Sequence, residues 1–228
     1  MHPQQPLALA PPAGPAEWSE RSLLDAATRR ALGSVNQAFL ALASDLAEEG
    51  RLKLIAGLPA RAIDSLIHPE AGDRLSARLP YALFDLRFGD GGFWEGEAAA
   101  AGGVQDASPA AGCDERLVTF ARAAVMLGHL AQTRPAAARL AFGTSPATIT
   151  ALARLPVAAV DRLTRRVAPT LAARFGSRAR FWLQFEGCAA HPDDRSVDEL
   201  QRLGLQIQGA ESARQQALQR RPRRAANA

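Results

Sequence analysis

Arginine supplies nearly all of the basic side chains in this 228-residue chain: of the 27 basic residues, only Lys53 is a lysine. The planar guanidinium of arginine donates paired hydrogen bonds that match phosphate and carboxylate oxygens. Residues 1–112 hold 9 basic and 14 acidic side chains, a net charge of −5, whereas residues 113–228 hold 18 and 9, a net charge of +9. The second half is therefore expected to attract a polyanion or an acidic protein.

The arginines of the second half fall into two groups. Seven of them, with Asp161 as the single acid, lie between residues 154 and 180, and the chain ends in ALQRRPRRAANA. An arginine excess also follows from a GC-rich genome, and a charged face is often only a solvated surface. As candidate contacts to DNA phosphates we select Arg154, Arg162, Arg165, Arg166, Arg178, Arg180, Arg220, Arg221, Arg223 and Arg224.

Other chemistry has little support in the sequence. Cys113, His129, Cys188 and His191 are scattered and lack the paired spacing of a metal site. Neither a phosphate-binding glycine loop nor a G-x-S-x-G elbow is present. We therefore predict a protein that is not an enzyme and that has no metal and no cofactor.

Composition also bears on location. Two cysteines are too few for a disulfide framework, which fits a reducing compartment. No run of about 18 apolar residues exists, and the first residues lack the basic and apolar regions of a secretory signal. The sequence predicts a cytoplasmic protein that does not enter a membrane.

Two similar phrases suggest an internal repeat. RFGDGGFW ends at Trp94 and RFGSRARFW ends at Trp182, 88 residues later. Gly57 and Gly143, which we expect in turns, are 86 residues apart. We predict two helical units of like topology related by a pseudo-twofold axis. The expected segments are a Pro-rich terminus (1–16), unit one (17–94), a small-residue linker (95–112), unit two with a C-terminal helix (113–213) and a basic tail (214–228).

Apolar spacing of three and four residues predicts an all-α fold. In unit two, Asp114 is expected to cap one helix, Pro135 to begin a second, and Ser145 with Pro146 to begin a third. The final helix is expected to break or bend near Gly204 and Gly209. A helix pair joined at Gly143 has the spacing of a helix-turn-helix, in which Ile149 and Leu152 pack the second helix on the first; an ordinary helix pair without DNA contact is the alternative.

Aromatic residues at the ends of the two phrases have two interpretations. Phe181 and Trp182 could stack on bases beside Arg178 and Arg180 if their rings were exposed. Because aromatic residues at the end of apolar runs are usually buried, we expect core packing, with Gly89 and Gly176 permitting turns.

Residues 130–175 resemble the FlhD family, one of the two components of the bacterial flagellar master transcriptional regulator. The resemblance rests on Gly143, Leu152, Ala153, Leu155, Leu163, Arg174 and Phe175. It implies an all-helical dimer that joins a zinc-bearing partner protein and binds promoter DNA. Two such units in tandem imply an internal pseudo-dimer or a homo-oligomer. A family cysteine is replaced here by Leu171, so no disulfide role is implied.

Two function classes follow. The first is a transcriptional regulator, or a regulator subunit with a partner protein, that binds DNA through the arginine-rich second half. The second is a helical adaptor that binds a partner protein through apolar helix faces without DNA.

Overall fold

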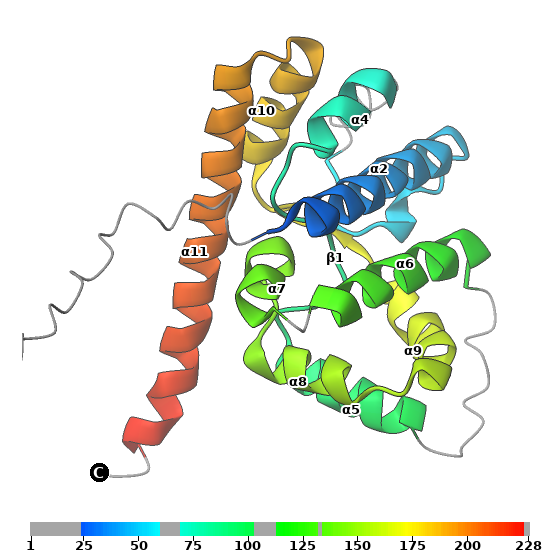
Figure 1. Ribbon diagram of the computed structural model, residues 1–228, viewed down its shortest axis with the longest axis vertical. Coiled ribbons are helices and arrows are strands. Elements are labelled where there is room, and N and C mark those ends of the chain that lie inside the picture. The colour runs from blue at the N-terminus through cyan, green and yellow to red at the C-terminus, as the bar shows by residue number, and fades with distance from the viewer. Residues whose placement is uncertain (1–23, 60–68, 103–112, 132–133, 226–228) are drawn as a thin grey trace, which may run out of the picture.

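The computed structural model describes residues 24–59, 69–102, 113–131 and 134–225. Helices dominate it, and a two-stranded antiparallel sheet lies at its centre (Figure 1), which confirms the all-α prediction. The elements are α2 (Ala26–Glu48), η2 (Leu52–Leu54), α4 (Pro69–Ser76), β1 (Phe84–Asp85), α5 (Gly91–Gly102), α6 (Glu115–Ala131), α7 (Pro135–Phe142), α8 (Pro146–Arg154), η3 (Val157–Ala159), α9 (Val160–Val167), η4 (Ala168–Thr170), β2 (Ala172–Ala173), α10 (Ala179–Ala190) and α11 (Asp194–Ala225).

Local sequence signals explain where the helices of unit two begin and end. Asp114 accepts a hydrogen bond from the backbone N–H of Arg116 at 2.9 Å before α6. Ser145 caps α8 by accepting the N–H of Thr148 at 3.0 Å. Gly143 ends α7 with a φ of 65°, a left-handed conformation that favours glycine. These caps confirm the predicted boundaries.

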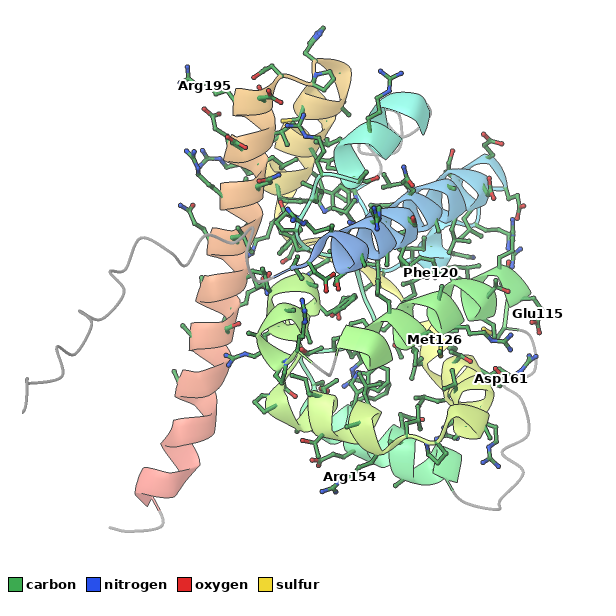
Figure 2. All side chains as sticks on the ribbon, in the orientation of Figure 1. Glu115, Phe120, Met126, Arg154, Asp161 and Arg195 are labelled. Atoms are coloured by element: carbon green, nitrogen blue, oxygen red, sulfur yellow. The ribbon has the colours of Figure 1, made fainter. Side chains whose placement is uncertain are left out.

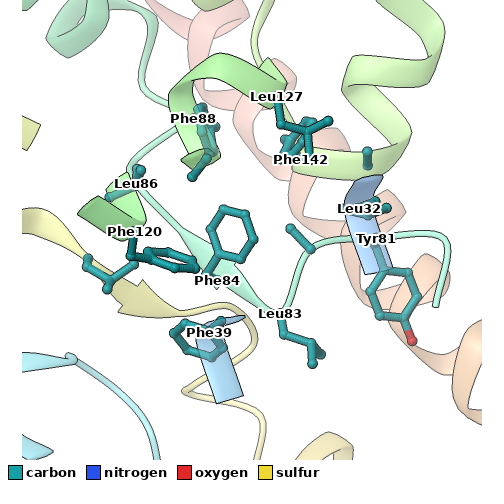
Figure 3. Packing of buried hydrophobic residues seen from close by; sticks show 14 of the residues in the cluster. Leu32, Phe39, Tyr81, Leu83, Phe84, Leu86, Phe88, Phe120, Leu127 and Phe142 are labelled. Atoms are coloured by element: carbon teal, nitrogen blue, oxygen red, sulfur yellow. The ribbon is translucent and has the colours of Figure 1, made fainter. Parts of the chain in front are cut away.

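A single hydrophobic core includes residues from both predicted units. At its centre the ring of Phe84 packs edge-on against Phe120, with centroids 5.0 Å apart, and Phe39 lies 5.8 Å from Phe120 (Figure 3). These three rings come from β1, α6 and α2, so the described residues of the two units share one core.

The strands bring the two units together. β1 pairs with β2 in the register Phe84 with Ala173 and Asp85 with Ala172. α2 packs on α6, α5 packs on α8 and α9, and α10 packs on α4. The helix that follows each strand therefore crosses to the other unit. The equal length of α5 and α10, whose first residues are 88 positions apart, agrees with a repeat, which stays a prediction.

The predicted linker is partly helical. Residues 95–102, placed at the start of the linker by composition, belong to α5, and residues 103–112 lie outside the described part. Alanine has the highest helix propensity, and packing on α8 and α9 gives this segment a tertiary partner. A small-residue composition was therefore a poor guide to an unstructured segment.

The final helix is not interrupted at its glycines, contrary to the prediction: α11 is a single helix of 32 residues that continues into the expected basic tail. At Gly204 a β-carbon would lie 2.2 Å from Cζ of Tyr81. The phenol of Tyr81 lies against the helix there and donates a hydrogen bond to the carbonyl of Leu200 at 2.9 Å. Gly204 is thus a position of close approach.

Gly89 and Gly176 lie in turns, as expected, although neither has a left-handed backbone. Left-handed φ angles fall on Arg87 (59°) and Phe175 (60°) rather than on Gly89 and Gly176. Gly176 serves another purpose, because a β-carbon there would lie 2.3 Å from the carbonyl oxygen of Gly57. The glycine allows two backbone segments to touch.

Two further observations bear on the expectations from the sequence. Within the described ranges, no helix combines the length and apolar character needed to cross a bilayer. Ile63 and Leu66, the unit-one counterparts of Ile149 and Leu152 at the 86-residue spacing, lie outside the described residues.

Candidate functional site

The arginines of α9 lie on its outer face, as predicted, because Val160, Leu163 and Val167 are buried on the inner one. Arg165 forms an ion pair of 2.7 Å with Glu115 of α6, and Arg166 forms one with Glu97 of α5. Both arginines are exposed, so solvent screens each pair and its contribution to stability is small. Both guanidinium groups are therefore already paired with carboxylates of α6 and α5. A DNA phosphate would have to compete with these carboxylates.

The other helix arginines do not join this group. Arg178 lies 3.5 Å from Glu211 of α11. Arg154 and Arg180 are exposed and form no hydrogen bond or ion pair within the described part of the chain. Figure 2 shows Arg154 at the lower end of the body near α8, whereas α10 lies in the upper half beside α11. The predicted helix contacts are thus spread over separate surfaces.

The helix-turn-helix-like pair is built into the body. α5 packs along α8, and a β-carbon on Gly91 would lie 2.5 Å from Cβ of Ala147. In such DNA-binding motifs the second helix needs a free face for the major groove. One side of α8 is covered here by α5, whereas its other side stays exposed at Pro146, Thr150, Ala153 and Arg154, so the packing of α8 does not decide between a helix-turn-helix and an ordinary helix pair.

Base stacking by the second phrase is not possible in this structure. Phe181 is fully buried and Trp182 is 1% exposed. The ring of Phe181 packs against Phe175, and that of Trp182 packs against Phe185. The expectation of core packing is confirmed.

The C-terminal part of α11 carries the strongest local charge. Residues 212–228 contain five arginines, Arg214, Arg220, Arg221, Arg223 and Arg224, and no acid. The helix continues to Ala225, and Figure 1 shows its last turns extending beyond the helices of the body. Spacings of three, four and seven residues put most of these positions on one side of a helix. This basic segment is the candidate nucleic-acid interface.

A cavity of about 310 Å³ lies near the paired strands, and sequence reasoning missed it. Arg174 lines it, and the position of this arginine within TLAARF, between small and aromatic residues, is the signal that could have indicated burial. It is only 8% exposed, and burial lowers the pKa of its guanidinium, although the carboxylate of Asp85 acts in the opposite direction. Burial also disfavours the charged form of Asp85, and for a carboxyl group this raises the pKa.

The scattered cysteines and histidines do not form a site. Cys188 is buried and its thiol donates to the carbonyl of Ser196 at 3.2 Å, whereas His191 is exposed. Cys113 bonds to the carbonyl of its neighbour Asp114, and the side chain of His129 is outside the described ones. Among the described residues, no group of three or more metal-ligating side chains comes together.

The fold defines the class of this chain, an all-α protein with a small central sheet. No family model, no curated protein and no solved structure matches it.

Proposed function

We propose that the chain is a non-enzymatic regulator, or a subunit of one, that contacts DNA phosphates through the basic segment 212–228. The acid-free run of five arginines on a helix that extends beyond the body carries this proposal. Such a segment attracts a duplex through counterion release, without reading its sequence. A cytoplasmic location and a partner subunit that adds sequence recognition go with this role.

The alternative, an adaptor that binds through apolar helix faces, has less support. The apolar faces of the described helices pack into the shared core. Among the described residues, Leu183, 56% exposed, is the one large apolar side chain on the surface. An apolar docking surface is normally a contiguous patch. The observation that favours an adaptor is that Arg165 and Arg166 of α9 already pair with carboxylates of α6 and α5.

A salt-titrated binding experiment tests the proposal. A labelled duplex of arbitrary sequence is titrated with the full chain and with a variant in which Arg220, Arg221, Arg223 and Arg224 are changed to Gln. We expect weaker binding in the variant, and a slope of log K against log salt that falls by about 0.9 for each phosphate that the variant no longer neutralises.

A matched variant separates a local site from net charge. Changing Arg29, Arg30, Arg139 and Arg202 to Gln removes the same charge from exposed positions elsewhere and should lower the slope much less. Equal effects of the two variants would contradict the proposal. The absence of DNA binding at about 50 mM salt, where electrostatic binding is strong, would also contradict the proposal if it held both with and without co-purifying proteins. A partner protein that binds stoichiometrically in the absence of any DNA binding would favour the adaptor.

A further inference from the structure

The cavity of about 310 Å³ lies where β1, β2, the turn at Gly143 and α11 meet, a place that the DNA proposal does not use. The residues that matter on its wall are Gly57, Asp85, Gly143, Arg174, Gln208 and Glu211. Its volume is near the lower end of the range for small-molecule sites. The cavity is therefore large enough for a small ligand, and the polar groups on its wall indicate which chemical groups such a ligand would carry.

Arg174 provides a buried cation with unused donors. Its Nη1 donates to the carbonyl of Ala141 at 2.6 Å, and its backbone N–H donates to Leu83. No carboxylate of the described residues lies within ion-pair distance of the guanidinium. A guanidinium has five N–H donors in a planar fork, and the carboxylates of Asp85 and Glu211 act on it only through space, without a direct hydrogen bond. An oxyanion in the cavity would supply the missing acceptors.

Gly143 is shaped for this arginine. A β-carbon on Gly143 would lie 2.6 Å from Nη2 of Arg174. Only glycine leaves room for the guanidinium at this turn while also adopting the positive φ that ends α7. The turn that resembled part of a helix-turn-helix thus forms one wall around a buried charge.

Gln208 provides the complementary group. It is buried, its Nε2 donates to the carbonyl of Arg139, and its Oε1 has no hydrogen-bond partner. Asp85 and Glu211 line the same cavity, and Glu211 also pairs with Arg178 at 3.5 Å, so acceptors and negative charge share the wall with Arg174. A buried acceptor without a donor is unfavourable, and a ligand N–H would remove that cost.

We propose that this cavity binds a small zwitterion of the amino-acid class, with its carboxylate on Arg174 and its ammonium group toward Gln208, Asp85 and Glu211. A simple carboxylate would leave Oε1 of Gln208 unpartnered and would face two acids. A simple amine would leave the guanidinium without an anion. A molecule that carries both groups satisfies both ends of the wall.

Calorimetric titration and thermal unfolding of the full chain test this proposal, with each of the twenty common amino acids as the probe. We expect at least one to raise Tm and to give saturable one-site binding. For the best of them, the analogue without the ammonium group and the analogue without the carboxylate should each bind at least about tenfold more weakly, since each lacks a charge-assisted hydrogen bond.

Variants localise the binding. Arg174→Lys keeps the charge but loses the fork, and Glu211→Gln removes a carboxylate at a half-buried position whose loss does not threaten folding; both should weaken binding. Glu199→Gln, on the same helix but paired with Arg195 away from the cavity, should not. Absence of binding by every amino acid, equal binding of the carboxylate-only analogue, or unchanged affinity in both Arg174→Lys and Glu211→Gln would overturn the proposal.

Discussion

Asp114 joins the beginning of α6 to the end of α2 through charge. Its carboxylate pairs with Arg116 and with Arg51, each at 2.9 Å, while Arg116 also holds Glu49 at 2.7 Å. The hydrogen bond from Arg116 is the main cause that lowers the pKa of Asp114 from 3.8 to about 2. Because the folded pKa lies below the unfolded one, this carboxylate stabilises the fold above about pH 4, and its contribution is lost as pH falls toward 2.

Asp114→Asn should therefore lower stability at pH 7 by up to about 1 kcal/mol, since the arginine partners lie at the surface. Asparagine remains a good helix cap, so the variant removes the charge alone. Chemical denaturation of both proteins between pH 7 and pH 2 measures the difference, which should become small at pH 2, where the folded carboxylate is about half protonated. Asp45→Asn, at an exposed position on α2, is the control; a difference for Asp114→Asn that does not change with pH would contradict the assignment.

At the residue scale, the sequence predicted groups whose role is local. Ser145, Pro146 and Gly143 act on backbone within a few positions, so their roles followed from spacing alone. Arg174 and Gln208 became a candidate site only through contacts with residues distant in the chain. Charge type gave no indication that one arginine of a basic run would be buried.

Helix α11 shows how an element can keep a glycine in its interior for packing. Glycine in a helix interior costs roughly 1 kcal/mol relative to alanine. At Gly204 the missing β-carbon makes room for the phenol of Tyr81. The ring of Tyr81 also packs edge-on against Phe175, with centroids 5.5 Å apart. At Gly209 nothing lies within 4 Å of the position that a β-carbon would occupy.

The two glycines should respond in opposite directions to alanine. Gly204→Ala is expected to destabilise the protein by about 1–3 kcal/mol, because the methyl group displaces the phenol. Gly209→Ala is expected to stabilise it by up to about 1 kcal/mol through helix propensity. Urea denaturation of the two variants measures both changes, and equal shifts would show that the contact with Tyr81 has no energetic weight.

Over the whole molecule, the shared core should make folding cooperative. Phe39, Phe84 and Phe120 join elements of both predicted units, and α5 and α10 each pack on the opposite unit. Differential scanning calorimetry of the full chain should give one transition with equal calorimetric and van't Hoff enthalpies. Residues 1–112 and 113–228 produced separately should each lack a cooperative transition. Two resolved transitions in the full chain would mean that the units fold independently.

The helical class and the individual helix boundaries could be predicted because periodicity and capping are local. The crossing of α5 and α10 could not, since the partner of a helix depends on which apolar face it meets in space. The alanine-rich segment 95–102 illustrates the difference: its composition resembled that of a linker, but its contacts with α8 and α9 are those of a structural helix.

The crossing of α5 and α10 also has a consequence for assembly. Each half supplies a helix that packs on the other half. Two separate chains that exchange a helix in this way form a domain-swapped dimer, whose stability depends on protein concentration. Here both halves belong to one polypeptide, so their encounter is intramolecular and its effective concentration is fixed by covalent connection. The stability of this fold should therefore not change on dilution, however scarce the protein is.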